Sequence, residues 1–75
     1  MRNGREELTQ REVEILRLAA EGLSTKLIAR ELGNAPSTIS NHLATIYLKL
    51  RALNRSEAVA IAGREGLLDG TPRDD

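Results

Sequence analysis

Apolar and polar residues recur along the chain at helical spacing and predict four helices and no strand. Thr9 and Glu12 have the pattern of a capping box, in which the Thr9 hydroxyl accepts from the Glu12 amide and the Glu12 carboxylate accepts from the Thr9 amide. The first helix is therefore expected from about Gln10 to Glu21, because Gly22 can take the left-handed conformation that ends a helix. Its apolar residues cover more than one face, which predicts a central helix contacted from two sides.

The next two helices are separated by a very short connection. Ser24 is expected to cap a helix over residues 25–32, which Gly33 ends. The following helix is expected over about 36–51, because Pro36 has a fixed φ that suits a first helical position. A connection of about three residues forces two helices to cross sharply, so this part of the chain predicts a helix-turn-helix.

A fourth helix is expected over about 55–62, capped by Asn54 and with a frayed end. Residues 1–7 are interpreted as a flexible N-terminal segment or linker, and residues 69–75 as a flexible C-terminal tail. Residues 8–68 then form one domain. The predicted fold class is all-α, a compact four-helix bundle in which the second and third helices form the helix-turn-helix.

The composition excludes several classes of protein. The 75-residue chain has no cysteine, so it holds neither a disulfide framework nor a thiolate zinc site. One tyrosine and no phenylalanine or tryptophan argue against aromatic platforms for single-stranded nucleic acids. His42 is the only histidine, so we expect no metal, no cofactor and no enzymatic activity. The polar start and the short apolar runs predict a cytoplasmic protein without a membrane segment.

Charge is unevenly distributed along the chain, although the formal net charge is zero. Residues 24–55 carry a net charge of +4, whereas the parts on both sides are net acidic. A local basic stretch can seat the phosphate backbone of a nucleic acid, and a solvated basic face is the alternative explanation. The charged residues of this stretch are Lys26, Arg30, Lys49, Arg51 and Arg55, with Glu31 as the acidic one.

The expected third helix has two contrasting sides. Its core side consists of Ile39, Leu43, Ile46 and Leu50. The opposite side gathers small or hydrogen-bonding residues, namely Ser37, Ser40, Asn41 and Ala44. A helix that reads base edges in the major groove must approach them closely, so bulky or acidic residues would obstruct it. We interpret the neutral side as a candidate base-reading face, with an ordinary solvent face as the alternative. Leu48 falls in the same sector, and packing under the fourth helix is one explanation for it.

Much of the chain follows a specific pattern of fixed spacings. The pattern comprises Leu8-Thr9-x-Arg11-Glu12-x-Glu14-Ile15-Leu16, Ala20-x-Gly22-x-Ser24-x-Lys26-x-Ile28-Ala29-x-x-Leu32, Thr38-Ile39-x-x-His42-x-x-x-Ile46-x-x-Lys49-Leu50 and Arg55-x-x-Ala58. These motifs resemble the LuxR/NarL-type, or GerE-like, helix-turn-helix domain over about residues 8–62. The resemblance implies a DNA-binding domain of transcription regulators, C-terminal to a sensing domain. It also implies that the third helix enters the major groove and that the fourth lies at a dimer interface.

The resemblance implies roles for particular residues of this sequence. The family's base-facing positions fall on Ser40, Asn41 and Ala44, in agreement with the neutral face. Thr38 is expected at a phosphate, with a helix-start hydrogen bond as the alternative. Lys49 is also expected at a phosphate, with a solvated lysine as the alternative. Further phosphate contacts are expected from Lys26, Arg30 and Arg55, and also from Arg51, although Arg51 departs from the family pattern. His42 is expected to be either a structural residue on the side of the helix or a residue close to a phosphate.

The chain departs from the family pattern at several positions. Ala35 stands where a capping serine is usual, so Asn34 is an alternative cap for the third helix. Ser40 replaces a common lysine and removes a positive charge from the recognition face. Leu27 occupies a usual glutamate position, and Arg51 a usual glycine position at the end of that helix. Sequence preference therefore does not carry over from the family.

The expected fourth helix has two apolar sides. One side faces the core and consists of Ala58, Ile61 and Ala62. The other side consists of Val59, Ala60 and Gly63. A second apolar side on a surface helix needs a partner, and two-fold packing on another copy would set two recognition helices about 34 Å apart. An exposed alanine-rich helix is the alternative.

The sequence thus predicts a sequence-specific, double-stranded DNA-binding domain that acts as a homodimer. The resemblance adds an N-terminal sensory domain in a full-length response regulator or ligand-sensing regulator, and RNA polymerase is a candidate further partner. One alternative is a sigma-factor-like promoter-reading domain, against which the dimer side argues. The other is a helical protein-interaction module whose basic middle binds an acidic partner.

Overall fold

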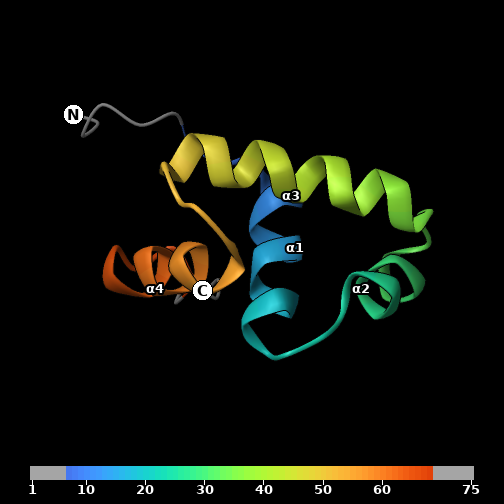
Figure 1. Cartoon of the computed structure of the whole chain (residues 1–75). Helices are drawn as coiled ribbons and strands as arrows, with labels where there is room; N and C mark the ends of the chain where they lie inside the picture. The colour runs from blue at the N-terminus through green and yellow to red at the C-terminus, as the bar shows by residue number, and fades with distance from the viewer. Residues whose placement is uncertain (1–6, 69–75) are drawn as a thin grey trace.

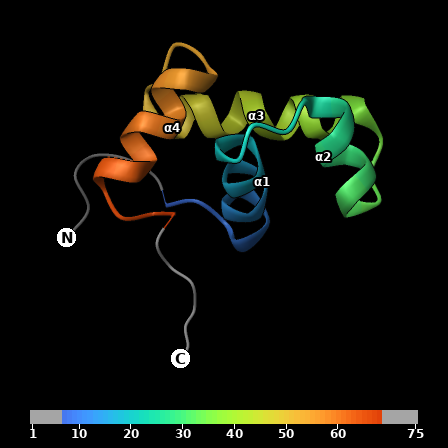
Figure 2. The same ribbon diagram turned by 90° about the horizontal axis from the view of Figure 1, so that it is seen from below.

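The computed structural model describes residues 7–68 of the chain. This part forms four helices and no strand: α1 (Gln10–Ala20), α2 (Thr25–Leu32), α3 (Pro36–Leu50) and α4 (Arg55–Arg64). α3 is the longest helix, and α1, α2 and α4 all lie on one side of it (Figure 1). Figure 2 shows the same grouping after a quarter turn. The predicted all-α fold with a helix-turn-helix is confirmed, while the proposed flexible ends lie outside the described residues, apart from Glu7.

The capping box at the start of α1 is confirmed. Thr9 Oγ1 accepts from the Glu12 amide at 3.1 Å, and Glu12 Oε1 accepts from the Thr9 amide at 2.9 Å. The helix ends at Ala20, one residue earlier than predicted, because Glu21 has a ψ of −2° and already leaves the helical path. Gly22 follows with a φ of 97°, as the predicted stop requires.

A tight turn joins α2 to α3. Ser24 caps α2 by accepting from the Leu27 amide at 3.2 Å, and Gly33 ends the helix with a φ of 72°. The Asn34 amide then donates back to the Ala29 carbonyl at 2.9 Å, which ties the turn to α2. The prediction that Asn34 caps α3 is wrong. Its side-chain Oδ1 is buried without a hydrogen-bond partner among the described residues, and α3 starts without a side-chain cap.

The connection from α3 to α4 is also tight. Arg51 adopts a left-handed φ of 59° at the end of α3, a conformation that favours glycine. Asn54 caps α4 by accepting from the Glu57 amide at 2.9 Å, as predicted. The Glu57 carboxylate accepts from the Leu53 amide at 2.6 Å. α4 continues to Arg64, two residues beyond the predicted end.

Each helix contributes to one apolar core, and α1 packs against the other three helices. This position confirms α1 as the central helix. The buried side of α3 is the predicted one, as is the buried side of α4. Within residues 7–68, no helix has both the length and the apolar character needed to cross a membrane. The buried apolar residues are Ile15, Leu16, Ala19, Ile28, Ala29, Ile39, Leu43, Ile46, Leu50, Ala58, Ile61 and Ala62.

Substitutions at Gly33 and Gly63 test how the backbone conformation contributes to the stability of this fold. A Cβ added at either Gly33 or Gly63 would meet nothing within 4 Å, so the two positions differ only in backbone conformation. Gly33→Ala should destabilise the domain by about 1–2 kcal/mol, because its positive φ is strained for an L side chain. Gly63→Ala should instead stabilise the domain by up to about 1 kcal/mol, because alanine favours a helix. Urea unfolding of both variants measures the two effects, and a common sign would contradict this account.

Candidate nucleic-acid interface

The outward side of α3 is open to solvent. Its four predicted base-reading residues are all exposed, namely Ser37, Ser40, Asn41 and Ala44. The opposite side of the helix carries Ile39 and Ile46, which are fully buried. None of the other described helices covers the outward side (Figure 1). The structure therefore brings the four predicted residues together on one accessible surface, which we call the outward face.

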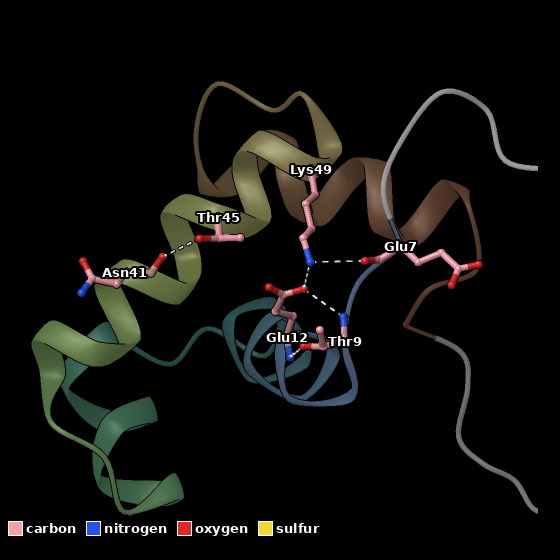
Figure 3. A network of polar contacts seen from close by, with 6 residues as sticks. All are labelled: Glu7, Thr9, Glu12, Asn41, Thr45 and Lys49. Atoms are coloured by element: carbon pink, nitrogen blue, oxygen red, sulfur yellow. Dashed lines mark hydrogen bonds and ion pairs between the residues drawn. The ribbon is translucent and has the colours of Figure 1, made fainter.

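Asn41 lies at the centre of the outward face. Figure 3 shows its side chain pointing away from the rest of the domain. Its main-chain carbonyl accepts from Thr45 Oγ1 at 3.2 Å, so the contact with Thr45 leaves the side-chain amide uninvolved. A side-chain amide offers one donor and one acceptor in a plane, which is the pair that adenine presents in the major groove.

The predicted phosphate-contacting residues fall into different environments. Lys26 and Arg30 are exposed and lie one turn apart on the same side of α2. Arg51 is exposed at the end of α3, whereas Thr38 and His42 are half-buried along it. Among the described residues, no group of three or more His, Asp or Glu side chains is arranged to hold a metal ion.

Lys49 has an internal partner. Its Nζ lies 2.8 Å from Glu12 Oε1 and also donates to the Glu7 carbonyl at 3.3 Å (Figure 3). Its side chain is only 16% exposed, so the solvated-lysine alternative is wrong. The ammonium points toward the start of α1 and away from the outward face. In the structure this positive charge is therefore paired inside the fold, and the predicted phosphate contact of Lys49 stays a prediction.

Glu12 serves both the capping box and this ion pair. Burial alone would raise the pKa of the Glu12 carboxyl, but hydrogen bonds from Lys49 and Thr9 and the charge of Lys49 outweigh burial and lower that pKa. Sequence analysis found the capping box because Thr9 is three residues away. It missed Lys49, which lies 37 residues away in the chain, because no local pattern connects the two residues.

Arg55 is also used inside the fold. Its guanidinium donates to the Leu23 carbonyl and, at 3.5 Å, to Thr25 Oγ1. These contacts tie the start of α4 to the connection between α1 and α2. Arg55 is half-buried and helps to position the helices, while its predicted phosphate contact stays a prediction.

The second apolar side of α4 is partly covered by the domain itself. Val59 is half-buried and packs against the core, whereas Ala60 and Gly63 are exposed. The side of α4 predicted to form a dimer is therefore accessible only as a narrow strip, Ala60 and Gly63, beside the half-buried Val59.

Comparison with known proteins agrees with this arrangement. Residues 6–62 match the family described as bacterial regulatory proteins, luxR family. The chain belongs to the luxR family. Its helix-turn-helix is of the kind that transcription regulators carry.

The luxR-family relatives are longer than this chain. Transcriptional regulatory protein YdfI of Bacillus subtilis strain 168 is 45% identical over 62 residues, which cover 83% of this chain and 29% of YdfI. The chain thus spans less than a third of that relative.

Three solved structures share the fold. The transcription factor GerE has a TM-score of 0.78 at 36% identity, over 84% of this chain and 94% of that chain. The response regulator ChrA has a TM-score of 0.80 at 37% identity, over 87% of this chain and 32% of that chain. The Vibrio cholerae VqmA–ligand–DNA complex has a TM-score of 0.82 at 30% identity, over 89% of this chain and 30% of that chain.

The Glu12–Lys49 pair makes the stability of this luxR-family domain depend on pH. Glu12→Gln should cost about 1–3 kcal/mol at pH 7, because Lys49 loses its counter-charge in a largely buried place while glutamine can still close the capping box. A carboxyl whose pKa is lowered by folding stabilises the fold above its unfolded pKa, and this stabilisation is lost as the pH falls through the folded pKa. The loss of unfolding free energy in Glu12→Gln should therefore persist at neutral pH and become smaller in acid. Urea titrations at a series of pH values measure it.

Glu14→Gln is the matched control. Glu14 pairs with Arg11 at 3.1 Å, with both side chains 44% exposed, so its loss should cost below about 0.5 kcal/mol. Equal losses of unfolding free energy for Glu12→Gln and Glu14→Gln would show that the pair with Lys49 stabilises the domain no more than an exposed ion pair does.

Proposed function

We propose that this domain binds specific sequences of double-stranded DNA as the effector domain of a transcription regulator, with α3 in the major groove. The observation that carries the proposal is the outward face of α3. This face is exposed, free of acidic side chains and uncovered by the other described helices. The likeness to VqmA, whose structure was determined in a complex with DNA, supports it. Membership of the luxR family favours this function over the sigma-factor-like and protein-interaction alternatives.

We assign the base contacts to the outward face. Asn41 can pair with adenine through two hydrogen bonds, and Ser40 can donate to or accept from several bases. Ala44 is small enough to let the helix approach and can contact a thymine methyl group. Ser37 extends the face toward the start of the helix. These four residues select a DNA sequence by hydrogen bonding and shape, since none of them carries a charge.

We assign the phosphate contacts to residues around the outward face. Lys26, Arg30 and Arg51 are exposed cations on α2 and at the end of α3. Thr38 and His42 lie along the same helix, and Thr38 is near its uncapped start, where backbone amides favour an anion. In this assignment Lys49 and Arg55 contribute by holding the helices in place.

We further propose that the domain dimerises through the outer side of α4, with Ala60 and Gly63 at the two-fold axis and Val59 beside them. Small residues let two helices approach closely, and a two-fold pair presents two recognition helices to successive major grooves. The greater length of YdfI and ChrA supports a sensory domain N-terminal to this one in a cytoplasmic response regulator or ligand-sensing regulator. RNA polymerase is the expected target of such a regulator, and the domain itself catalyses nothing.

Substitutions at Asn41 and Lys26 distinguish base reading from phosphate binding. On a duplex selected from a random pool by the wild-type chain, Asn41→Ala should weaken binding by about 1–3 kcal/mol, and on an unselected duplex it should change little. Lys26→Ala should weaken both complexes alike and lower the slope of log affinity against log salt by about 1. Fluorescence anisotropy at several salt concentrations measures both. Equal losses for Asn41→Ala on the two duplexes would remove Asn41 from the base-reading set.

Ala60 tests the dimer. Ala60→Glu should place two like charges at the two-fold axis, so the variant should sediment as a monomer at concentrations where the wild-type chain dimerises. Ala20→Glu makes the same chemical change at an exposed position on α1 and should leave the dimer intact. Analytical ultracentrifugation compares the two. An unchanged dimer in Ala60→Glu would place the interface elsewhere.

A further inference from the structure

Leu48 is a large apolar side chain with no place in the core. It is 79% exposed, and only Leu27 and Leu53 are comparable large exposed apolar residues within the described part of the chain. The explanation that Leu48 packs under α4 is wrong, because α4 lies on the core side of α3 (Figure 1). At about 100° per residue, Leu48 lies about 180° from the buried Ile39 around the helix axis. In the free domain this side chain therefore gains almost nothing from burial.

The position of Leu48 on α3 continues the outward face. At about 100° per residue, Leu48 lies about 40° from Ala44 and about 20° from Asn41 around the helix axis. Along the axis it lies about 6 Å beyond Ala44, since each residue rises about 1.5 Å. A base-pair step rises about 3.4 Å along the DNA axis, and a helix in the major groove is inclined to that axis. A helix that presents Ala44 to one base pair thus presents Leu48 to the groove about one or two steps further on.

Leu48 makes the last turn of the outward face apolar, and the exposed Arg51 follows only after the helix ends. Lys49, the next residue, directs its ammonium inward to Glu12, so it places no positive charge beside Leu48. A leucine side chain has neither donor nor acceptor and cannot read the hydrogen-bonding pattern of a base pair. The apolar group that the major groove offers is the C5-methyl of thymine, which distinguishes thymine from cytosine.

We propose that Leu48 is a further specificity-determining residue, which contacts a thymine methyl group about one or two base-pair steps beyond the base pair that Ala44 meets. This inference rests on the proposed function of α3 as the recognition helix. It assigns a preference for thymine to a position of the operator that the polar residues of the outward face do not reach. Leu53 lies after α3, in the connection to α4, and is 85% exposed, so it provides a control of matched chemistry outside the face.

The test uses the whole chain and a duplex selected by it from a random pool. Each thymine of that duplex is replaced in turn by deoxyuridine, which lacks only the methyl group. One replacement should weaken wild-type binding about fourfold, the ratio that corresponds to about 0.8 kcal/mol for one buried methyl group. Leu48→Ala should weaken binding to the unmodified duplex by at least that factor and should abolish the effect of that one replacement. Leu53→Ala should change neither quantity.

Two results would overturn the inference alone, and a third would overturn the proposed function on which it rests. If Leu48→Ala binds every duplex as the wild-type chain does, Leu48 belongs to another surface, such as one that binds a protein. If Leu48→Ala and Leu53→Ala weaken binding equally, the effect is not specific to the outward face. If the wild-type chain enriches no duplex, the proposed function itself fails, which distinguishes that failure from the failure of this inference. Circular dichroism confirms that both variants fold, as their exposure predicts.

Discussion

Burial of one apolar stripe of α3 is the constraint on which the rest of this structure depends. Ile39 and Ile46 have no exposed surface, and the other three helices pack on that side of α3 alone. A helix is rigid around its axis, so fixing one side against the core fixes what the opposite side presents to solvent. The outward face is thus set by the same contacts that stabilise the domain. A rotation of α3 would lose core burial before it could bring other residues to the groove.

Two of the cations in the basic stretch serve the fold. The Lys49 ammonium joins the end of α3 to the start of α1 through Glu12, and the Arg55 guanidinium joins α4 to the connection before α2. A domain this small buries a limited core, so contacts that hold distant elements together matter more than they would in a larger protein. The orientation of α3 therefore depends on the positive charges of Lys49 and Arg55. The charge pattern of the sequence alone would assign both of them to contacts with DNA.

The outward face carries no charged side chain, which is unusual for a surface that is proposed to approach a polyanion. Its residues are neutral, and the exposed cations lie beside it on α2 and at the end of α3. In the proposed function, affinity and specificity are carried by separate groups, because phosphate contacts position a domain while base contacts select the sequence. With Ser40 in place of a lysine and Leu48 at the far end, this proposal assigns selection to hydrogen bonds and methyl contacts rather than to charge.

The sequence by itself determined the helices, the side-chain caps of α1, α2 and α4, and the two sides of α3. Thr9 with Glu12 and the positive φ of Gly33 depend on neighbours within a few residues, so local chemistry was enough to predict them. The resemblance to a known family supplied the expected roles of whole elements, and the comparisons confirmed the family. Only the tertiary structure decided that Lys49 turns inward and that Leu48 stays in solvent. Lys49 meets a partner 37 residues away, and Leu48 is exposed because the three other helices pack elsewhere on α3. Neither relation can be predicted from residues close in the sequence.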